Sequence, residues 1–428
     1  MNMAQLPLKN VRILDPSMWW AGPYASTLLA YLGAEVIKIE SWYHLDPWRG
    51  DVKVPPGIDR YPDHTPGERP YNRNAYFNRV NHNKWDITLD LRHPLGQDIF
   101  QRLIKVSDVV LENYGSKARE KLGIEFEKLK KVNPMIILAS LPMFGLSGPE
   151  KDFRGYGNTI EALSGIYQAT GYPGGKPQML GHTAFGDPIA AFNAAFAILV
   201  ALNHRKQNGT GCHLEIAQIE ALARFSGLAL MGYAMSGRNP ERSGNRHSSM
   251  APHDCFPCKG QDAWVSLSVA SDEEWQALCR VMGKPELATN PRFSGSLNRW
   301  KNQDELEGII SDWTRQHTHY EVMEKLQKAG IAAGPLLTMP ELFEDPHLKE
   351  RGFFEMVSHP EAGTHPYESS PIRLGPSGDK TIRTPSPCLG EHNEYVYKEI
   401  LRLSEEEIAE LEKEKVISKI PAAIGLFS

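Results

Sequence analysis

A carboxylate stands at the start of the longest apolar stretch of the chain, within residues 181–206. Asp187 precedes Pro188, and proline is favoured in the first turn of a helix because its ring fixes φ and its missing N–H is not needed there. We therefore predict that Asp187 caps a helix over residues 187–205 and accepts hydrogen bonds from that helix's own N–H groups. Such bonds keep a carboxylate ionised and aimed, which suits nucleophilic catalysis. A helix cap without a chemical role is the alternative.

Two cysteines, Cys255 and Cys258, form a C-F-P-C sequence. This spacing occurs in zinc sites and in thiol–disulfide sites. A structural zinc site usually takes four ligands, and no second cysteine pair exists at a suitable spacing, although His247 and His253 are near in sequence. A redox site normally opens a helix after a strand of a βαβ unit, which this segment does not do. We therefore favour a protein without a bound metal.

The common nucleotide and hydrolase motifs are absent from the sequence. No G-x-G-x-x-G follows an expected strand, and residues 171–176 lack the frame and the Ser or Thr of a phosphate-binding loop. The sequence also has no G-x-S-x-G and no H-E-x-x-H. A dinucleotide-binding site, a serine-hydrolase elbow and a zinc-protease helix are therefore unsupported.

The elements that must position the candidate side chains alternate between strand and helix. Apolar runs typical of strands cover residues 11–15, 35–40, 85–91, 107–113, 135–140 and 213–217. Helical spacing covers residues 22–34, 95–106, 117–134 and 187–205, and a further helix runs through about residue 235. The alternation predicts an α/β fold with a parallel sheet, whose ligands bind at the carboxyl ends of its strands. Trp19 and Trp20 follow the first strand, so we expect either a substrate-lining role or a core role.

Composition changes after Gly237, where residues 238–255 are polar and rich in turn formers. Residues 256–330 resemble a small α+β unit, and the chain is irregular from Gly334, with short strands near 353–357 and 371–374. We therefore predict a large domain in two segments, residues 1–237 and 331–428, and a small α+β domain over residues 238–330. Residues 41–80 show no periodicity and are predicted to form a long functional loop.

The charge balance excludes several classes of partner. The chain has 428 residues with 47 basic and 52 acidic side chains, a net charge of −5, which argues against nucleic acid or an anionic membrane as the main partner.

The start of the sequence lacks the pattern of a signal peptide. The apolar stretch from Ile189 to Leu202 is shorter than the roughly 20 residues of a membrane span. Five unpatterned cysteines favour a reducing compartment, so we expect a cytoplasmic protein.

Eight stretches, taken in order, resemble the class III CoA-transferases of the CaiB/BaiF type. They are residues 11–40, 81–91, 109–124, 133–149, 186–221, 243–252, 345–354 and 387–393. The resemblance implies a discontinuous Rossmann-like large domain, a smaller domain, and a dimer of two interlocked rings. It also implies that coenzyme A thioesters are substrates, that no cofactor is tightly bound, and that Asp187 is the catalytic nucleophile. Asp187 would pass through a mixed anhydride and an aspartyl–CoA thioester.

The resemblance implies coenzyme A contacts at the Ala21 backbone, Asn113, Tyr114 and Lys121. Tyr114 would stack on adenine and Lys121 would meet a phosphate, although a solvated helix residue is the alternative for Lys121. Many members carry Arg directly after the strand that ends at Glu40, whereas this chain has Ser41 and Trp42. We expect another basic residue, Lys84 or Arg49, to take that role.

The acid substrate would lie against Trp19, Trp20 and Met18, with Tyr156 and the segment around His247 nearby. This bulky lining favours an aromatic or branched acid, and no Gly-rich run of the formate/oxalate type occurs between residues 237 and 262. An α-methylacyl-CoA racemase is the rival activity, but Tyr156 stands where racemases carry His. A CoA-binding subunit of a heteromeric transferase is the third reading, so the partner is either a second copy or a homologous subunit.

Overall fold

The computed structural model describes residues 6–55, 57–179, 184–374 and 380–422, which fall into two compact units. The larger unit comprises Met1–Ile166, Met179–Met231 and His347–Ser428. The smaller unit comprises Tyr167–Gln178 and Gly232–Pro346.

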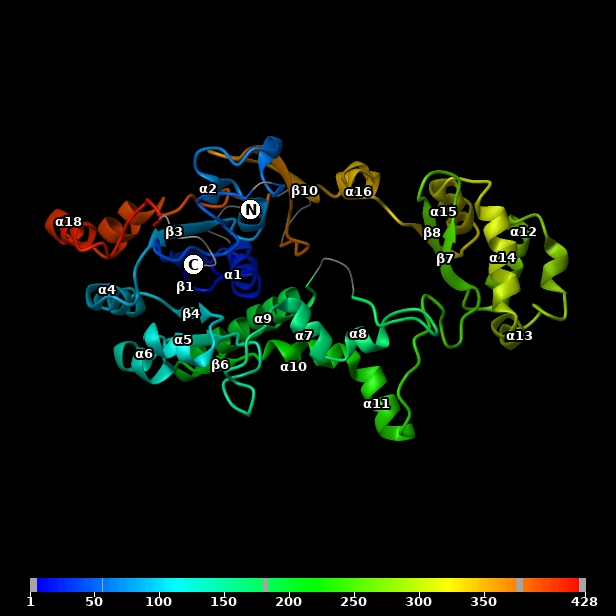
Figure 1. Ribbon diagram of the computed structural model, residues 1–428, viewed down its shortest axis with the longest axis horizontal. Helices are drawn as coiled ribbons and strands as arrows, with labels where there is room; N and C mark the ends of the chain where they lie inside the picture. Colours follow the sequence, from blue (N-terminus) through cyan, green and yellow to red (C-terminus); the bar gives the residue numbers. More distant parts are fainter. Residues whose placement is uncertain (1–5, 56, 180–183, 375–379, 423–428) are drawn as a thin grey trace. The chain divides into compact units, whose positions relative to one another are not determined.

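A six-stranded parallel sheet is the centre of the larger unit (Figure 1). Its strands are β1 (Arg12–Asp15), β2 (Glu35–Glu40), β3 (Lys84–Thr88), β4 (Val109–Glu112), β5 (Ile137–Ser140) and β6 (His213–Glu215). They lie in the order β3-β2-β1-β4-β5-β6, and every pair is parallel. The order reverses between β1 and β4, which makes that crevice the expected ligand site. The predicted α/β fold with a parallel sheet is confirmed.

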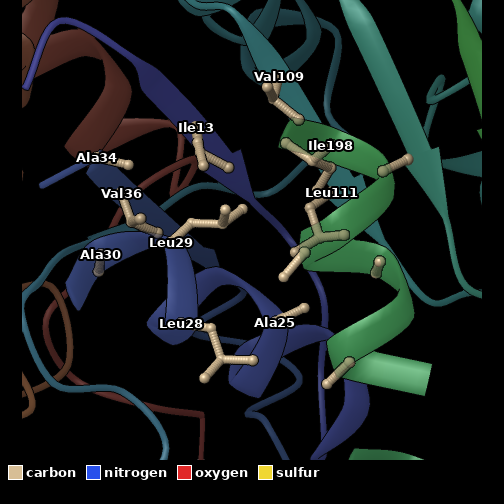
Figure 2. Close-up of a cluster of buried hydrophobic side chains, with 14 of the residues drawn as sticks. Ile13, Ala25, Leu28, Leu29, Ala30, Ala34, Val36, Val109, Leu111 and Ile198 are labelled. Atoms are coloured by element: carbon tan, nitrogen blue, oxygen red, sulfur yellow. The ribbon is translucent and has the colours of Figure 1, made fainter. Parts of the chain in front are cut away.

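Both faces of this sheet are buried, and alternate residues serve opposite faces. Ile13 and Val109 pack into one apolar cluster, whereas Leu14 and Val110 pack into another. This two-residue alternation, with apolar side chains on both faces, explains why the strands read as continuous apolar runs. Helices α1 (Ala21–Tyr31) and α9 (Gly186–Asn208) cover the first face. Figure 2 shows Ala25 and Leu28 of α1 and Ile198 of α9 in this cluster with Ile13 and Val109.

The second face is covered by α4 (Pro94–Lys105), α6 (Phe126–Val132) and the C-terminal helix α18 (Glu405–Lys413), together with a π-helical turn over Tyr395–Ile400. The remaining helices of four residues or more in or bordering this unit are α2 (Pro70–Arg73), α3 (Ala75–Arg79), α5 (Ser116–Lys121), α7 (Gly157–Leu163), α8 (Ile166–Ala169), α10 (Gln218–Ala223), α11 (Gly227–Ser236) and α17 (Pro346–Glu350). An antiparallel hairpin of β10 (Phe354–His359) and β11 (Gly363–Glu368) belongs to the C-terminal segment.

The smaller unit is built on an antiparallel sheet of β7 (His253–Pro257), β8 (Trp264–Ser268) and β9 (Ala332–Pro335). Its helices are α12 (Asp272–Val281), α13 (Ser296–Lys301), α14 (Gln303–Thr314), α15 (His319–Lys328) and α16 (Met339–Glu344). Trp275 and Leu278 of α12 are buried in its core beside Leu267 of β8. The unit therefore has an apolar core of its own.

The local predictions differ from the structure in several places. The predicted helix 117–134 is divided into α5 and α6 because Gly123 adopts a φ of +69° and ends the first of them. β7 lies in the polar segment that was expected to be a crossing, and β11 replaces the strand expected near 371–374. The smaller unit continues beyond residue 330 because β9 pairs with β8. It also includes residues 167–178, where Gly244 N–H donates to the Gly171 carbonyl.

Helix α9 has 23 residues and is the one helix, among those that the structure describes, with the length and hydropathy to cross a membrane. One side of it packs against α1 and β5, where Ala190, Ala191 and Ala194 are fully buried. The other side carries exposed apolar residues, and Phe196 is 68% exposed. The apolar residues of 189–202 therefore lie on two sides of α9: one side is packed in the core and the other is uncovered in this chain.

Residues 41–80, predicted to form one long loop, contain the short helices α2 and α3, and buried ion pairs fasten this segment to the strands. The Arg49 guanidinium donates to Glu40 (2.7 Å) and to Asp86 (3.3 Å), and it also reaches the Pro387 carbonyl (3.1 Å).

The Lys84 ammonium donates to Asp15 (3.1 Å) and to the Pro23 carbonyl (2.7 Å). Burial lowers the pKa of Lys84 to about 8, although Asp15 opposes this shift. Arg49 and Lys84 are therefore both enclosed and paired inside the unit.

Replacing Lys84 with methionine is expected to lower the free energy of unfolding by about 3 kcal/mol. The Asp15 carboxylate would then stay buried with one of its two neighbouring cations removed. Urea denaturation at pH 7 measures this loss. The double variant Asp15→Asn/Lys84→Met is the control, and it should lose less stability than Lys84→Met alone because the lost cation leaves no buried carboxylate behind. Unchanged stability of Lys84→Met would contradict this role.

Candidate active site

Two cavities open at the carboxyl ends of the strands of the larger unit. The first has a volume of about 880 Å³ and is lined by the loop after β1, the segments after β4 and β5, and Asp187; we call it the Asp187 cavity. The second has a volume of about 270 Å³ and is lined by residues that follow β1 to β4, among them Tyr114; we call it the Tyr114 cavity. Ala118 of α5 lines both. Both cavities lie where the strand order predicts a ligand site.

Asp187 lies inside the first turn of α9, so the prediction that it caps this helix is wrong. The helix begins at Gly186, and the capping position falls on Phe185, whose backbone is already helical. The N–H of Ala21, the first residue of α1, instead lies close enough to the Asp187 carboxylate to lower its pKa. A helix N-terminus carries partial positive charge, so α1 supplies much of the polar environment that α9 was expected to provide.

Burial raises the pKa of the Asp187 carboxyl to about 7. The Ala21 N–H lowers this pKa, and the negative charge of Glu161 raises it. The sequence predicted a carboxylate held ionised by helix N–H groups, and the shift has the opposite direction because loss of solvent outweighs those hydrogen bonds. Near pH 7 the group is therefore divided between its acid form and its carboxylate form.

Gly157, the first residue of α7, makes room for the Asp187 side chain. A Cβ at this position would overlap both Asp187 Oδ2 and the Ala184 side chain. A Cβ at Gly186 would be in tight but not overlapping contact, 3.3 Å, with Ile160 of α7. The starts of α7 and α9 therefore approach each other closely, and the carboxylate lies over a position that only glycine fits.

The loop between β1 and α1 is held by polar contacts from neighbouring strand ends. The Asn113 side chain accepts from Met18 N–H (2.9 Å) and donates to the Met18 carbonyl (2.6 Å). The Tyr114 hydroxyl donates to the Pro16 carbonyl (2.7 Å), and Asp46 accepts from Trp19 N–H (3.1 Å). Trp19 has a φ of +66°, which is strained for a bulky residue, so these bonds determine a conformation that it would not adopt alone.

Aromatic side chains from this loop line the Asp187 cavity. The Trp19 ring meets the Tyr156 ring edge to face, with centroids 5.2 Å apart, and Trp20 lies against Trp48 with centroids 5.4 Å apart. All four of these residues line the same cavity as Asp187. The structure thus brings together Asp187, Trp19, Trp20 and Tyr156, which the sequence placed in one site.

Basic side chains stand in the lining of both cavities. Lys121 of α5 and Arg92, which follows β3, line the Tyr114 cavity with His44. Arg92 is paired with Asp90 (2.9 Å). The cations of the Asp187 cavity are Lys117, Lys151 and Arg154. Lys84 and Arg49 line neither cavity, since both are enclosed by the ion pairs described above.

His247 and the cysteine pair belong to the smaller unit. His247 Nδ1 accepts from the N–H groups of Ser249 (3.2 Å) and Met250 (3.3 Å). Cys258 is buried in the core of this unit, whereas Cys255 is half-buried. Within the described residues, no group of three or more His, Cys, Asp and Glu side chains could hold a metal ion.

The family model of CoA-transferase family III matches residues 8–393. The chain belongs to CoA-transferase family III. It is 33% identical over 413 residues to the succinyl-CoA–D-citramalate CoA-transferase of Chloroflexus aurantiacus, covering 96% of this chain and 98% of the relative. It is 31% identical over 425 residues to a formyl-CoA:oxalate CoA-transferase of Rhodopseudomonas palustris, covering 94% and 95%. A CaiB/BaiF family protein from Brucella suis has a similar fold, with a TM-score of 0.81, 32% identity and coverage of 92% and 99%.

Sequence reasoning missed four groups at the site of this CoA-transferase. Arg92 directly follows an expected strand, so its place at a carboxyl end was readable from the sequence. Trp48 lies in the loop that was expected to be functional, but nothing marked it within that loop. Gly157 and Glu161 flank Asp187 only because α7 packs against α9, and no local pattern announces such packing.

Replacing Gly157 with alanine should lower kcat/KM of this CoA-transferase by about 100-fold. The added methyl group would displace the Asp187 carboxylate from the Ala21 N–H, and small displacements of reacting groups have effects of this size. Chromatographic assay of CoA exchange between acids measures the loss. Gly227→Ala is the control, since a methyl group there meets open space. Equal activity of the two variants would show that the position of Asp187 does not depend on Gly157.

Proposed function

We propose that this CoA-transferase moves coenzyme A from an acyl-CoA to a free carboxylic acid through covalent intermediates on Asp187. The observation that supports this best is a half-buried carboxylate at the N-terminus of α1, in the lining of an 880 Å³ cavity. A carboxylate is a weak nucleophile in water, and burial with a raised pKa strengthens it. The ionised fraction, present at neutral pH, is the reacting form.

The reaction begins when an Asp187 oxygen attacks the thioester carbonyl carbon. The carbon–sulfur bond breaks, coenzyme A leaves as a thiolate, and a mixed anhydride remains. The thiolate then attacks the aspartyl carbonyl, which releases the donor acid as a carboxylate and leaves an aspartyl–CoA thioester. The acceptor carboxylate attacks this thioester, and the same two steps run in reverse. One thioester replaces another, so neither ATP nor a bound cofactor is required.

The N–H of Ala21 is suited to stabilise the oxyanion of each tetrahedral intermediate. It already contacts the Asp187 carboxylate, and its helix dipole favours negative charge at that point. Because Ala21 binds the reacting group itself, we assign the role to Ala21.

Coenzyme A is proposed to occupy both cavities, with Asn113 between them. Its adenine would lie against Tyr114, and its phosphates would meet Lys121 and Arg92 in place of the Arg that many members carry after β2. The acyl end would extend past Ala118, which lines both cavities, toward Asp187. The net charge of the chain does not oppose this, since a local group of cations suffices for a polyanionic ligand.

The exposed apolar side of α9 supports an assembly of two chains. Phe192, Phe196 and Val200 lie at helical spacing on this side and are each at least 45% exposed. Patches of this kind are typical of protein–protein interfaces. We propose a dimer, either of two copies of this chain or with a homologous subunit, in the cytoplasm.

Incubation with an acyl-CoA alone should give a covalent CoA adduct on the peptide that contains Asp187. We expect the adduct in intact-protein and peptide mass spectra after testing a panel of short, branched and aromatic acyl-CoA thioesters. Hydroxylamine should remove it, because it cleaves thioesters and anhydrides. Asp187→Ala should show no adduct and no turnover. Turnover that survives this substitution would refute the mechanism.

The same protein samples distinguish racemase activity from transferase activity. A racemase exchanges the α-proton of its substrate with solvent and needs no acceptor acid. Tyr156 occupies the position of the racemase histidine, so the imidazole that would serve as the base is missing there. We therefore expect no deuterium incorporation at the α-carbon in heavy water without an acceptor acid.

Replacing Trp20 with alanine should change which acceptor acids the enzyme prefers. Trp20 and Trp48 narrow the Asp187 cavity with their paired rings, so removal of the indole enlarges the space near the acid. We expect kcat/KM for aromatic and branched acids to fall by roughly ten- to a hundredfold relative to small acids, since one lost apolar contact surface has an effect of this order. Met282→Ala, a truncation in the smaller unit's core, controls for general destabilisation. An unchanged acid profile would remove Trp20 from specificity.

A further inference from the structure

Glu161 of α7 is a fully buried carboxyl group that the mechanism above does not use. Its Oε1 accepts a hydrogen bond from the N–H of Phe185, the residue at the capping position of α9. Asp187 follows two residues later. One acidic side chain is thus anchored to the backbone that carries the nucleophile.

The contacts between α7 and α9 keep these two carboxyl groups in a fixed relation. Gly157, one turn before Glu161, lies directly under Asp187 Oδ2, and Ile160 packs on Gly186. Glu161 therefore cannot move away from Asp187 without disturbing the start of α9. Such rigid placement is what a fixed charge needs in order to act on a neighbouring group.

Among the described residues, Glu161 is the one charged group that shifts the pKa of Asp187. The α1 helix contributes the uncharged N–H of Ala21. The ionisable side chains elsewhere in the lining of the cavity are Lys117, Lys151, Asp152, Arg154 and Tyr156. The Glu161 charge is therefore the one to remove in a test of the pKa of Asp187.

We propose that Glu161 is a positioning residue whose charge destabilises the free Asp187 carboxylate and thereby favours the covalent aspartyl–CoA thioester. This inference rests on the proposed function. In the overall half-reaction, the Asp187 carboxylate and an acyl-CoA become the aspartyl–CoA thioester and a free carboxylate. The negative charge leaves the site with the donor acid. Two neighbouring like charges repel each other, so forming the neutral thioester relieves the repulsion.

The direction of the pKa shift of Asp187 agrees with this role. Burial raises this pKa most, and Glu161 adds to the rise, whereas the Ala21 N–H opposes it. Removing the Glu161 charge should therefore lower the pKa of Asp187. The ionised form would then persist to lower pH, and the free carboxylate would be more stable relative to the thioester.

The test uses Glu161→Gln, which keeps an oxygen to accept the Phe185 N–H and removes the charge. The full-length protein is equilibrated with the acyl-CoA that gives the largest adduct and with a fixed concentration of its free acid. Intact-protein mass spectrometry then gives the ratio of adduct to free enzyme. We expect this ratio to fall about three- to tenfold, and the acidic limb of the kcat/KM profile to move to lower pH, as expected for the loss of one nearby charge.

Two further variants test whether the Glu161 charge or its hydrogen bond causes the change in the adduct ratio and the pH profile. Glu161→Ala removes both the charge and the hydrogen bond, and Glu220→Gln removes an exposed carboxylate from α10, which packs against α7. Glu220→Gln should leave both readouts unchanged. If Glu161→Gln keeps the adduct ratio and the pH profile while Glu161→Ala loses activity, Glu161 is only an anchor and the proposal is overturned. Absence of an adduct on the unmodified protein would instead overturn the proposed function and this inference with it.

Discussion

The close packing of α1 against α9 is the constraint on which the site depends. Small side chains make it possible, since Ala21 and Ala25 of α1 and Ala190, Ala191 and Ala194 of α9 are all fully buried. Alanine faces let helix backbones approach closely, and this brings the first N–H of α1 to a carboxylate in the first turn of α9. Larger side chains in this face would separate the helices and move the Ala21 N–H away from the Asp187 carboxylate.

Buried charges at the strand ends help to hold the loop between β1 and α1, which precedes the contact between α1 and α9. Arg49 links β2, β3 and the C-terminal return through Glu40, Asp86 and the Pro387 carbonyl. Lys38 contacts Asp46, which in turn accepts from Trp19 N–H. Buried ion pairs contribute little net stability against apolar alternatives, but an unpaired partner is strongly unfavourable. The network therefore favours one loop conformation over others more than it stabilises the fold.

Much of the fold could be predicted from the sequence because its signals are local. The predicted strand 35–40 matches β2, and the predicted helix 95–106 differs from α4 by one residue at each end. Apolar runs and helical spacing reflect burial directly. The division at Gly123 was missed because a glycine in a helical pattern is often tolerated, and only its positive φ reveals the break.

The site was less predictable because its partners come from distant parts of the chain. Asp187 could be selected from its sequence context, but the N–H that lowers its pKa belongs to α1 and the charged group that raises its pKa belongs to α7. Lys84 and Arg49 looked available as ligands because sequence alone does not reveal that Asp15, Glu40 and Asp86 enclose them. A basic residue is free or paired according to tertiary contacts, which no local spacing encodes.

The proposed mechanism makes acid recognition and oxyanion stabilisation depend on one short loop. Trp19 lines the cavity, and Ala21, two residues later, supplies the N–H that meets Asp187. Between them the backbone passes from a left-handed residue into α1, under control of Asp46 and Asn113. A change that moves Trp19 to admit another acid also turns the Ala21 N–H. Substitutions at other residues that line the cavity, such as Trp48 and Tyr156, can therefore change the accepted acid more easily than substitutions at Trp19.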